Sequence, residues 1–179
     1  MFRSLVVVAL AVGVARADVE SGPKAGEKAG PVKAFGVVGT VEGKEADFVA
    51  ERKGAPTVYL FVNASKFDRP MNQFIKTLDG KITDIDAKAM AVAVWLTDDA
   101  DKSKEFVAVV QKSVKYENTS LAVLGETAGP NGWGINPDAH LTAVVVVGGK
   151  VVKSFPYESI NGTDSKAVLE SLKKAVEKK

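Results

Sequence analysis

The chain has 179 residues, 46% of them hydrophobic and 26% charged, a composition typical of one globular domain with a sizeable core. Its 24 basic and 22 acidic residues nearly cancel, so the charge gives no reason to expect nucleic acid or an anionic membrane as a partner. It contains no cysteine, which excludes thiol–disulfide exchange, thiol peroxidase chemistry, iron–sulfur clusters and thioether-linked haem.

Residues 1–17 have the pattern of a secretory signal peptide. Arg3 supplies a positive charge, residues 5–14 are apolar, and Ala15-Arg16-Ala17 fits an A-x-A cleavage site. So short an apolar stretch does not span the ~30 Å of bilayer hydrocarbon, which favours cleavage over an N-terminal anchor. We therefore expect an exported protein, periplasmic or extracellular, that has no membrane contact after cleavage.

Residues 18–33 are rich in Gly, Pro, Lys and Glu and have few large apolar side chains. This composition predicts a flexible, extended lead-in, with the folded domain over residues 34–179. The domain is expected to begin with a short strand within residues 34–41, followed by a turn or helical piece over residues 46–52.

The most apolar strand pattern in the chain is Thr57-Val58-Tyr59-Leu60-Phe61-Val62. β-Branched and aromatic residues favour strands, and a strand without a polar face belongs in the middle of a sheet. We expect it to lie between the strands at residues 89–96 and 142–147.

One helix is predicted before the strand at residues 89–96 and another after it. The first has Asp68 as a cap, Pro70 in its first turn and apolar residues at helical spacing, which are Met71, Phe74, Ile75 and Leu78. The second follows Thr97-Asp98-Asp99, and its expected inner residues are Phe106, Val109, Val110 and Val114.

The remaining pattern predicts a short strand over residues 121–124, an irregular segment over residues 125–140, a hairpin and a last helix. The hairpin turns at Gly148-Gly149, and the helix follows residues 161–164. Strands that alternate with helices indicate a parallel core, and the hairpin adds antiparallel pairing. The expected fold class is therefore α/β, with a mixed sheet and helices on both faces.

Several short stretches resemble the thioredoxin-like superfamily, in particular its exported redoxin branch. They are Gly26-Glu27-Lys28-Ala29, Glu42-Gly43-Lys44, Lys53-Gly54-Ala55-Pro56-Thr57-Val58 and the run from Leu141 to Lys150. The resemblance implies a thioredoxin-like three-layer sandwich. Where that family has its Cys-x-x-Cys pair, this chain reads Ser65-Lys66-Phe67-Asp68, and Leu141 takes the position of the family's cis-proline. The family's redox activity is therefore not carried over.

Ser65, Asp68 and His140 are the candidate catalytic residues. A serine nucleophile needs an adjacent base, and His140, the sole histidine, precedes the position that borders this site in the resembling family. Against this, Ser65 has no nucleophile-elbow pattern around it, and a polar cap explains it more simply. The acids and the single histidine lack metal-ligand spacing, so the sequence predicts no metal and no cofactor.

A binding groove is the alternative use of the same region. Phe67 and Arg69 follow the central strand, whereas Trp133 and Asn136 lie in the irregular segment. Because both segments follow strand ends, we expect the four side chains to converge on one groove in which Trp133 is partly exposed.

The sequence favours a non-catalytic binding module whose partner is a protein or a small molecule. Two alternatives stay open. One is an enzyme that uses Ser65, Asp68 or His140, and the other is a redox-related protein that depends on a partner or cofactor.

Overall fold

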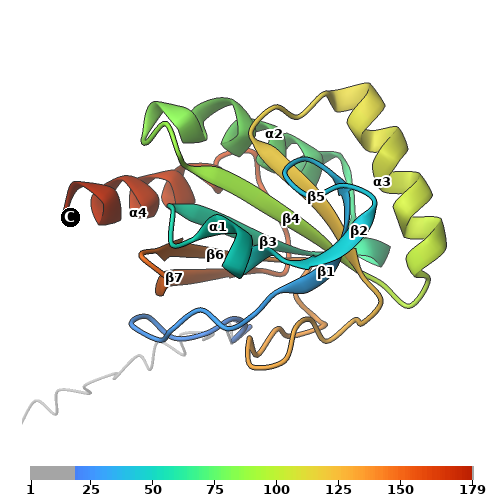
Figure 1. Ribbon diagram of the computed structural model, residues 1–179, viewed down its shortest axis with the longest axis horizontal. Coiled ribbons are helices and arrows are strands. Elements are labelled where there is room, and N and C mark those ends of the chain that lie inside the picture. The colour runs from blue at the N-terminus through green and yellow to red at the C-terminus, as the bar shows by residue number, and fades with distance from the viewer. Residues whose placement is uncertain (1–18, 179) are drawn as a thin grey trace, which may run out of the picture.

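The structure is a computed structural model that describes residues 19–178, so the predicted signal peptide lies outside the described residues. A seven-stranded sheet runs through its centre in the order β2-β1-β5-β4-β3-β6-β7 (Figure 1). The strands are β1 (Lys33–Val38), β2 (Lys44–Asp47), β3 (Thr57–Asn63), β4 (Met90–Leu96), β5 (Thr119–Leu124), β6 (Leu141–Val147) and β7 (Lys150–Tyr157).

Strand β3 lies inside the sheet, as predicted. It runs parallel to β4, with Phe61 opposite Val94, and antiparallel to β6, with Phe61 opposite Thr142. The β6–β7 hairpin turns at Gly148 and Gly149, whose φ angles of 63° and 74° favour glycine. The sheet is therefore mixed, as the order of elements indicated.

The two faces of the sheet are covered unequally. Side chains alternate along β3, so that Leu60 faces one core and Phe61 the other. The first core lies under three helices, and the second lies under one short helix together with irregular segments. The three helices are α2 (Arg69–Lys81), α3 (Ala100–Val114) and α4 (Ser165–Glu177), and the short one is α1 (Phe48–Arg52). Helices occur on both faces, and the fold class is thioredoxin-like α/β.

Helix α2 begins as its sequence signals indicate. After β3 the chain makes one 3-10 turn, η1 (Ala64–Lys66). The Asp68 carboxylate then accepts a hydrogen bond of 2.9 Å from the backbone N–H of Met71, and Pro70 occupies the first turn. Because this junction is short, the residues at the start of α2 are held beside the end of β3.

The inner face predicted for α3 is right for Val110 and Val114, which pack on the core, and wrong for Phe106 and Val109. Phe106 is 46% exposed and Val109 is 61% exposed, whereas Val107 is fully buried. The buried stripe includes Ser103, whose hydroxyl donates a 3.0 Å hydrogen bond to Thr97 Oγ1. Because that bond satisfies the hydroxyl, burying Ser103 costs little free energy. Phe106 and Val109 therefore face outward.

The prediction of a flexible lead-in is also wrong for the part that the structure describes. Its backbone pairs with the free edge of β7, with hydrogen bonds from Gly26 N to Val151 O (2.8 Å) and from Val151 N to Glu27 O (2.8 Å). Val32 is fully buried in the core under α1. The segment is extended, as expected, but the sheet edge fixes it in place.

Candidate binding groove

The groove lies at the carboxyl ends of the parallel strands β3 and β4, on the right-hand side of Figure 1. Ligands of open α/β sheets bind in this position. Two hollows meet here at Phe67, which lines both, and together they are called the Phe67 groove. One hollow of about 900 Å³ lies between η1 and the start of α3, and the other, of about 420 Å³, lies between α2 and α3.

Aromatic side chains form the middle of the Phe67 groove. The ring centroid of Phe67 lies 5.3 Å from that of Trp95 and 5.7 Å from that of Phe106. Trp95 is fully buried, and its indole N–H has no hydrogen-bond partner among residues 19–178. Phe106 borders the larger hollow and Val109 the smaller one. These two are the exposed large hydrophobic side chains of the described residues, and both lie at this groove.

The charged side chains of the larger hollow are mainly acidic. Asp98, Asp99, Asp101 and Lys102 line it, which gives three acids against one base, and we call it the acidic hollow. The Asp99 carboxylate caps α3 by accepting from Lys102 N at 3.1 Å, and Asp101 pairs with Lys104 at 3.0 Å. The Asp98 carboxylate is exposed and makes no hydrogen bond or ion pair within the described part of the chain.

The smaller hollow is largely apolar. Its lining residues are Phe67, Asp68, Arg69, Asn72, Val109, Val110, Ser113 and Val114, and we call it the apolar hollow. The one acid, Asp68, is already engaged as the cap of α2. Phe67 and Arg69, two of the four residues expected to line a groove, both line this hollow.

The expected place of Trp133 in this groove is wrong. Trp133 is only 1% exposed and packs on the opposite face of the sheet, with its ring centroid 5.3 Å from Tyr59 and 5.0 Å from Phe61. Its indole N–H donates to Pro31 O at 3.3 Å. The irregular segment folds back under the sheet because the short helix α1 leaves much of that face to be covered.

Asn136 likewise serves the irregular segment and does not line the groove. Its backbone N–H donates to Ser21 Oγ at 2.9 Å, and its side-chain amide donates to Glu20 O at 3.5 Å. Ser21 is buried and also shares a 2.7 Å hydrogen bond with Thr142 Oγ1. Asn136 therefore ties residues 125–140 to the lead-in.

The candidate catalytic residues do not form a nucleophile–base pair. The Ser65 hydroxyl donates to Asn63 Oδ1 at 2.8 Å, and that amide oxygen is no base. His140 meets this region through its backbone, since His140 O accepts from Asn63 N at 3.0 Å. Asp68 acts as a helix cap. Ser65 and His140 share no hydrogen bond in the described structure.

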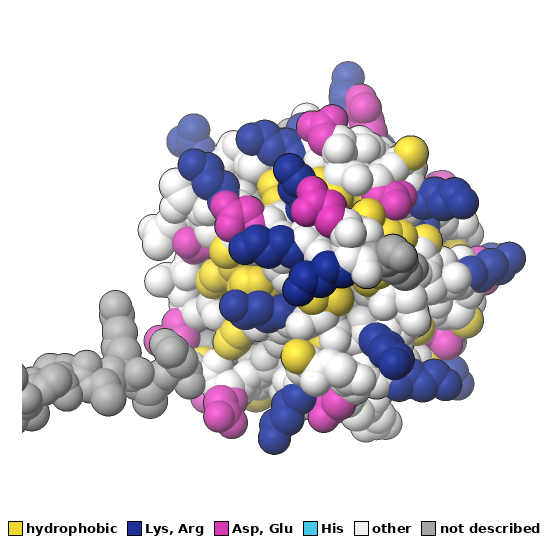
Figure 2. Space-filling model, turned by 90° about the vertical axis from the view of Figure 1, so that its left-hand side faces the viewer, with side chains coloured by type: hydrophobic (Ala, Val, Ile, Leu, Met, Phe, Trp, Pro, Cys, Tyr) yellow, Lys and Arg dark blue, Asp and Glu magenta, His cyan; other side chains and the backbone are white. Residues whose placement is uncertain are grey.

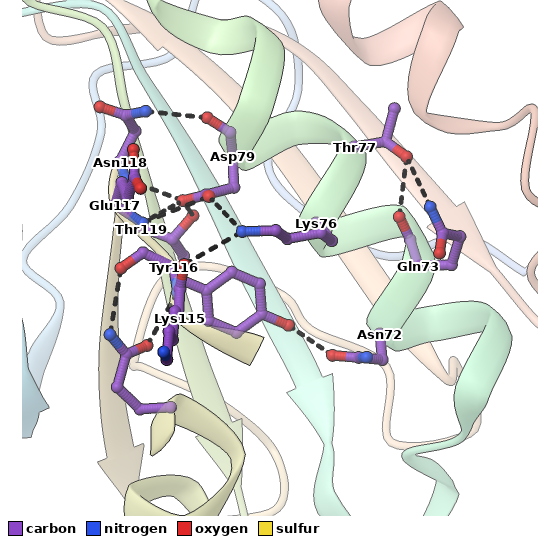
Figure 3. A network of polar contacts seen from close by, with 11 residues as sticks. Asn72, Gln73, Lys76, Thr77, Asp79, Lys115, Tyr116, Glu117, Asn118 and Thr119 are labelled. Carbon is purple, nitrogen blue, oxygen red and sulfur yellow. Dashed lines mark hydrogen bonds and ion pairs between the residues drawn. The ribbon is translucent and has the colours of Figure 1, made fainter. Parts of the chain in front are cut away.

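A buried carboxylate that the sequence analysis missed lies at the other end of α2. Asp79 is 2% exposed and accepts hydrogen bonds from Glu117 N (3.0 Å), Asn118 N (2.8 Å) and Thr119 Oγ1 (2.9 Å) (Figure 3). It also pairs with Lys76 at 3.3 Å. A buried carboxylate with this many donors is satisfied, so Asp79 fixes the connection from α3 to β5.

Tyr116 extends this arrangement, which we call the Asp79 network. Tyr116 lies in the connection between α3 and β5, and its hydroxyl donates a 2.6 Å hydrogen bond to Asn72 Oδ1 on α2 (Figure 3). Burial, and secondarily the nearby Asp79 carboxylate, raise the pKa of Tyr116 above its ordinary value. The signal for Asp79 was present in the sequence, because it follows Ile75 by four residues and so falls on the apolar stripe of the helix.

A further hollow of about 480 Å³ lies at the opposite end of the sheet and is lined by Arg52, Lys53, Lys88 and Asp86, among others. Figure 2 shows the left-hand side of the molecule, where Lys and Arg side chains lie among acids and small apolar patches. Arg52 is engaged by Thr57 Oγ1 at 3.0 Å, by Pro56 O at 3.3 Å and by Lys88 O. These bonds give the guanidinium a structural role.

Over residues 19–178 we find no group of three acidic or histidine side chains placed to hold a metal ion. Within the same residues, none of the helices has the length and apolarity needed to cross a bilayer.

Solved structures with redoxin-type folds superpose on most of the chain. A thioredoxin-like protein from Porphyromonas gingivalis is 16% identical, with 84% of this chain and 92% of that one covered and a TM-score of 0.63. Peroxidoxin BcpB from Mycobacterium tuberculosis is 14% identical, with 84% and 97% covered and a TM-score of 0.60. The pneumococcal exposed lipoprotein thioredoxin from Streptococcus pneumoniae is 18% identical, with 81% and 99% covered and a TM-score of 0.56.

Neither a protein-family model nor a curated protein matches the sequence. The likenesses to solved structures therefore concern the fold. The chain has the thioredoxin-like fold without any cysteine.

Proposed function

We propose that this thioredoxin-like chain is a non-catalytic binding module that holds its partner in the Phe67 groove. The observation that carries the proposal is the position of Phe106 and Val109. Exposing two large apolar side chains to water is unfavourable, and in this protein both of them wall the same groove.

The dimensions and chemistry of the groove support binding. The two hollows, about 900 and 420 Å³, fall in the range of ligand sites, which is roughly 300–1,000 Å³. Aromatic side chains form its centre, and aromatic residues are over-represented where proteins recognise one another. The absence of cysteine removes the thiol chemistry that this fold position serves in redoxins.

We also propose that the module acts outside the cytoplasm. The A-x-A signal at residues 15–17 supports this location, as does the exposed lipoprotein among the proteins of similar fold.

The test is capture of partners from the native extract with the protein that lacks residues 1–17. Wild type should retain a partner that a Phe106→Ser variant releases, because the serine removes the apolar wall of the acidic hollow. The matched control is Glu105→Ser, since Glu105 is exposed on the same helix and lines neither hollow. Equal capture by all three proteins would refute a role for the groove.

A further inference from the structure

We infer that the Phe67 groove selects an extended peptide segment in which a basic side chain lies next to an aromatic or large aliphatic one. This inference rests on the proposed function and specifies the class of partner. It follows from the different chemistry of the two hollows that meet at Phe67.

The apolar hollow accounts for the large apolar side chain of the peptide. Its walls include Phe67, Val109 and Val110, and it holds one acid and one base. The acid, Asp68, is committed to capping α2. A pocket of this kind gains most from burying one aromatic or aliphatic anchor, which is how the strongest contacts of protein interfaces are made.

The acidic hollow accounts for the basic side chain. Three carboxylates and one ammonium group line it, so its formal charge is two negative units. Asp99 and Asp101 have partners within the chain, whereas the carboxylate of Asp98 has none among the described residues. A lysine or arginine placed here would give Asp98 a charge-assisted hydrogen bond, and a glutamate would be repelled.

The position of Phe67 sets the spacing between the two peptide side chains. Because Phe67 lines both hollows, a ligand that fills both must cross this ring. Neighbouring residues of an extended peptide are separated by about 3.3 Å along the chain and their side chains point to opposite sides of it, so two adjacent side chains can enter the two hollows that meet at this ring. The groove is thus suited to a short sequence motif and needs no folded partner surface.

The experiment measures binding of capped peptides by isothermal titration calorimetry at low salt. The peptides are acetyl-Gly-Lys-Phe-Gly-amide and its Phe-Lys reversed form, each with matched versions in which Gln or Glu replaces Lys. One of the two residue orders should bind better than the other. In that order, we expect the Lys peptide to bind about tenfold more tightly than its Glu version, with the Gln version between them. Asp98→Asn should reduce this ratio to about threefold or less.

The control is Asp84→Asn, which removes an exposed acid at the other end of the sheet and should leave the ratio unchanged. If all versions bind equally and Phe106→Ser weakens each of them, the charge preference is wrong but the groove still binds. If the Glu version binds best, or if no peptide binds to folded protein, the inference is overturned. The capture experiment with Phe106→Ser then decides the proposed function separately.

Discussion

Helix α2 begins beside the Phe67 groove and ends in the Asp79 network, and the surroundings of its two ends differ. At the end of the helix, the buried Asp79 carboxylate accepts hydrogen bonds from two residues of the connection before β5 and from the first residue of β5. These bonds hold α2 to β5. At the start, the hydrogen bond from Tyr116 to Asn72 is joined only by aromatic rings and open hollows as tertiary neighbours. The helix is therefore held more firmly at its end than at its start, which is left accessible to a partner.

The largest expected effect is at the locked end. Asp79→Ala should lower the free energy of unfolding by about 3–5 kcal/mol, because it leaves one buried and two part-buried donors without an acceptor and removes the ion-pair partner of Lys76. Urea denaturation measures this change. Asp84→Ala, which removes an exposed acid nearby in sequence, should cost less than about 0.5 kcal/mol. A loss below about 1 kcal/mol for Asp79→Ala would contradict the role of the network.

The start of the helix should show a smaller loss. Asp68→Ala removes the acceptor for Met71 N, and losing such a cap costs about 0.5–2 kcal/mol. Asp68→Asn is the matched control, since asparagine caps helices about as well as aspartate. Equal unfolding midpoints for wild type and Asp68→Ala would show that the cap contributes nothing here.

Tyr116→Phe tests the neutral part of the Asp79 network. The substitution removes the hydrogen bond to Asn72 and should cost about 0.5–1.5 kcal/mol at neutral pH. Phenylalanine keeps the packing of the ring, so the heat capacity of unfolding should not change. A variant as stable as wild type would show that this bond is no stronger than the one with water.

The same tyrosine predicts a dependence on alkaline pH. Its pKa is raised in the folded protein, while in the unfolded chain it ionises near pH ~10. Its contribution to stability is therefore complete below pH ~10 and is lost as the pH rises through the folded pKa. Unfolding measured from pH ~8 to ~11 should show a smaller alkaline loss in Tyr116→Phe than in wild type. Identical pH profiles would contradict the assigned shift.

The smallest effect on stability is expected in the groove. Phe106→Ser should change the free energy of unfolding by about 1 kcal/mol or less, because the ring is about half exposed and packs on Phe67 alone among the aromatic rings. Val107→Ala, one residue along and fully buried, should cost about 2 kcal/mol. If the serine variant lost more than the alanine variant, Phe106 would be a core residue and the groove would be closed in solution.

Several parts of the fold could be predicted from local pattern alone. Residues 57–62 carry enough β-branched and aromatic side chains to fix β3 inside the sheet, and Asp68 with Pro70 marks the start of α2. The glycine pair at residues 148–149 identifies the hairpin. Each of these signals acts within a few residues, so no knowledge of the tertiary structure was needed.

The errors occur where tertiary packing decides. Helix α3 has two possible apolar stripes that share Val110 and Val114. The buried one contains Ser103, a polar residue that the pattern excluded and whose hydroxyl is satisfied by Thr97. Trp133 has no periodicity around it, and its burial depends on space left beneath the sheet by a short helix elsewhere. For the candidate site, the sequence pattern pointed to Phe67 and Arg69, which line the apolar hollow, but not to the residues of α3 that line the same groove.

The pairing of the lead-in with β7 has a consequence for association between molecules. An uncovered strand edge is a template for pairing with other chains, and here the backbone of residues 26–29 occupies the first part of that edge. The same segment supplies the carbonyl of Pro31 that binds the indole of Trp133. A chain cut before Lys33 would present both an unpaired edge and an uncovered aromatic ring, and it should aggregate at concentrations where the full domain remains monodisperse.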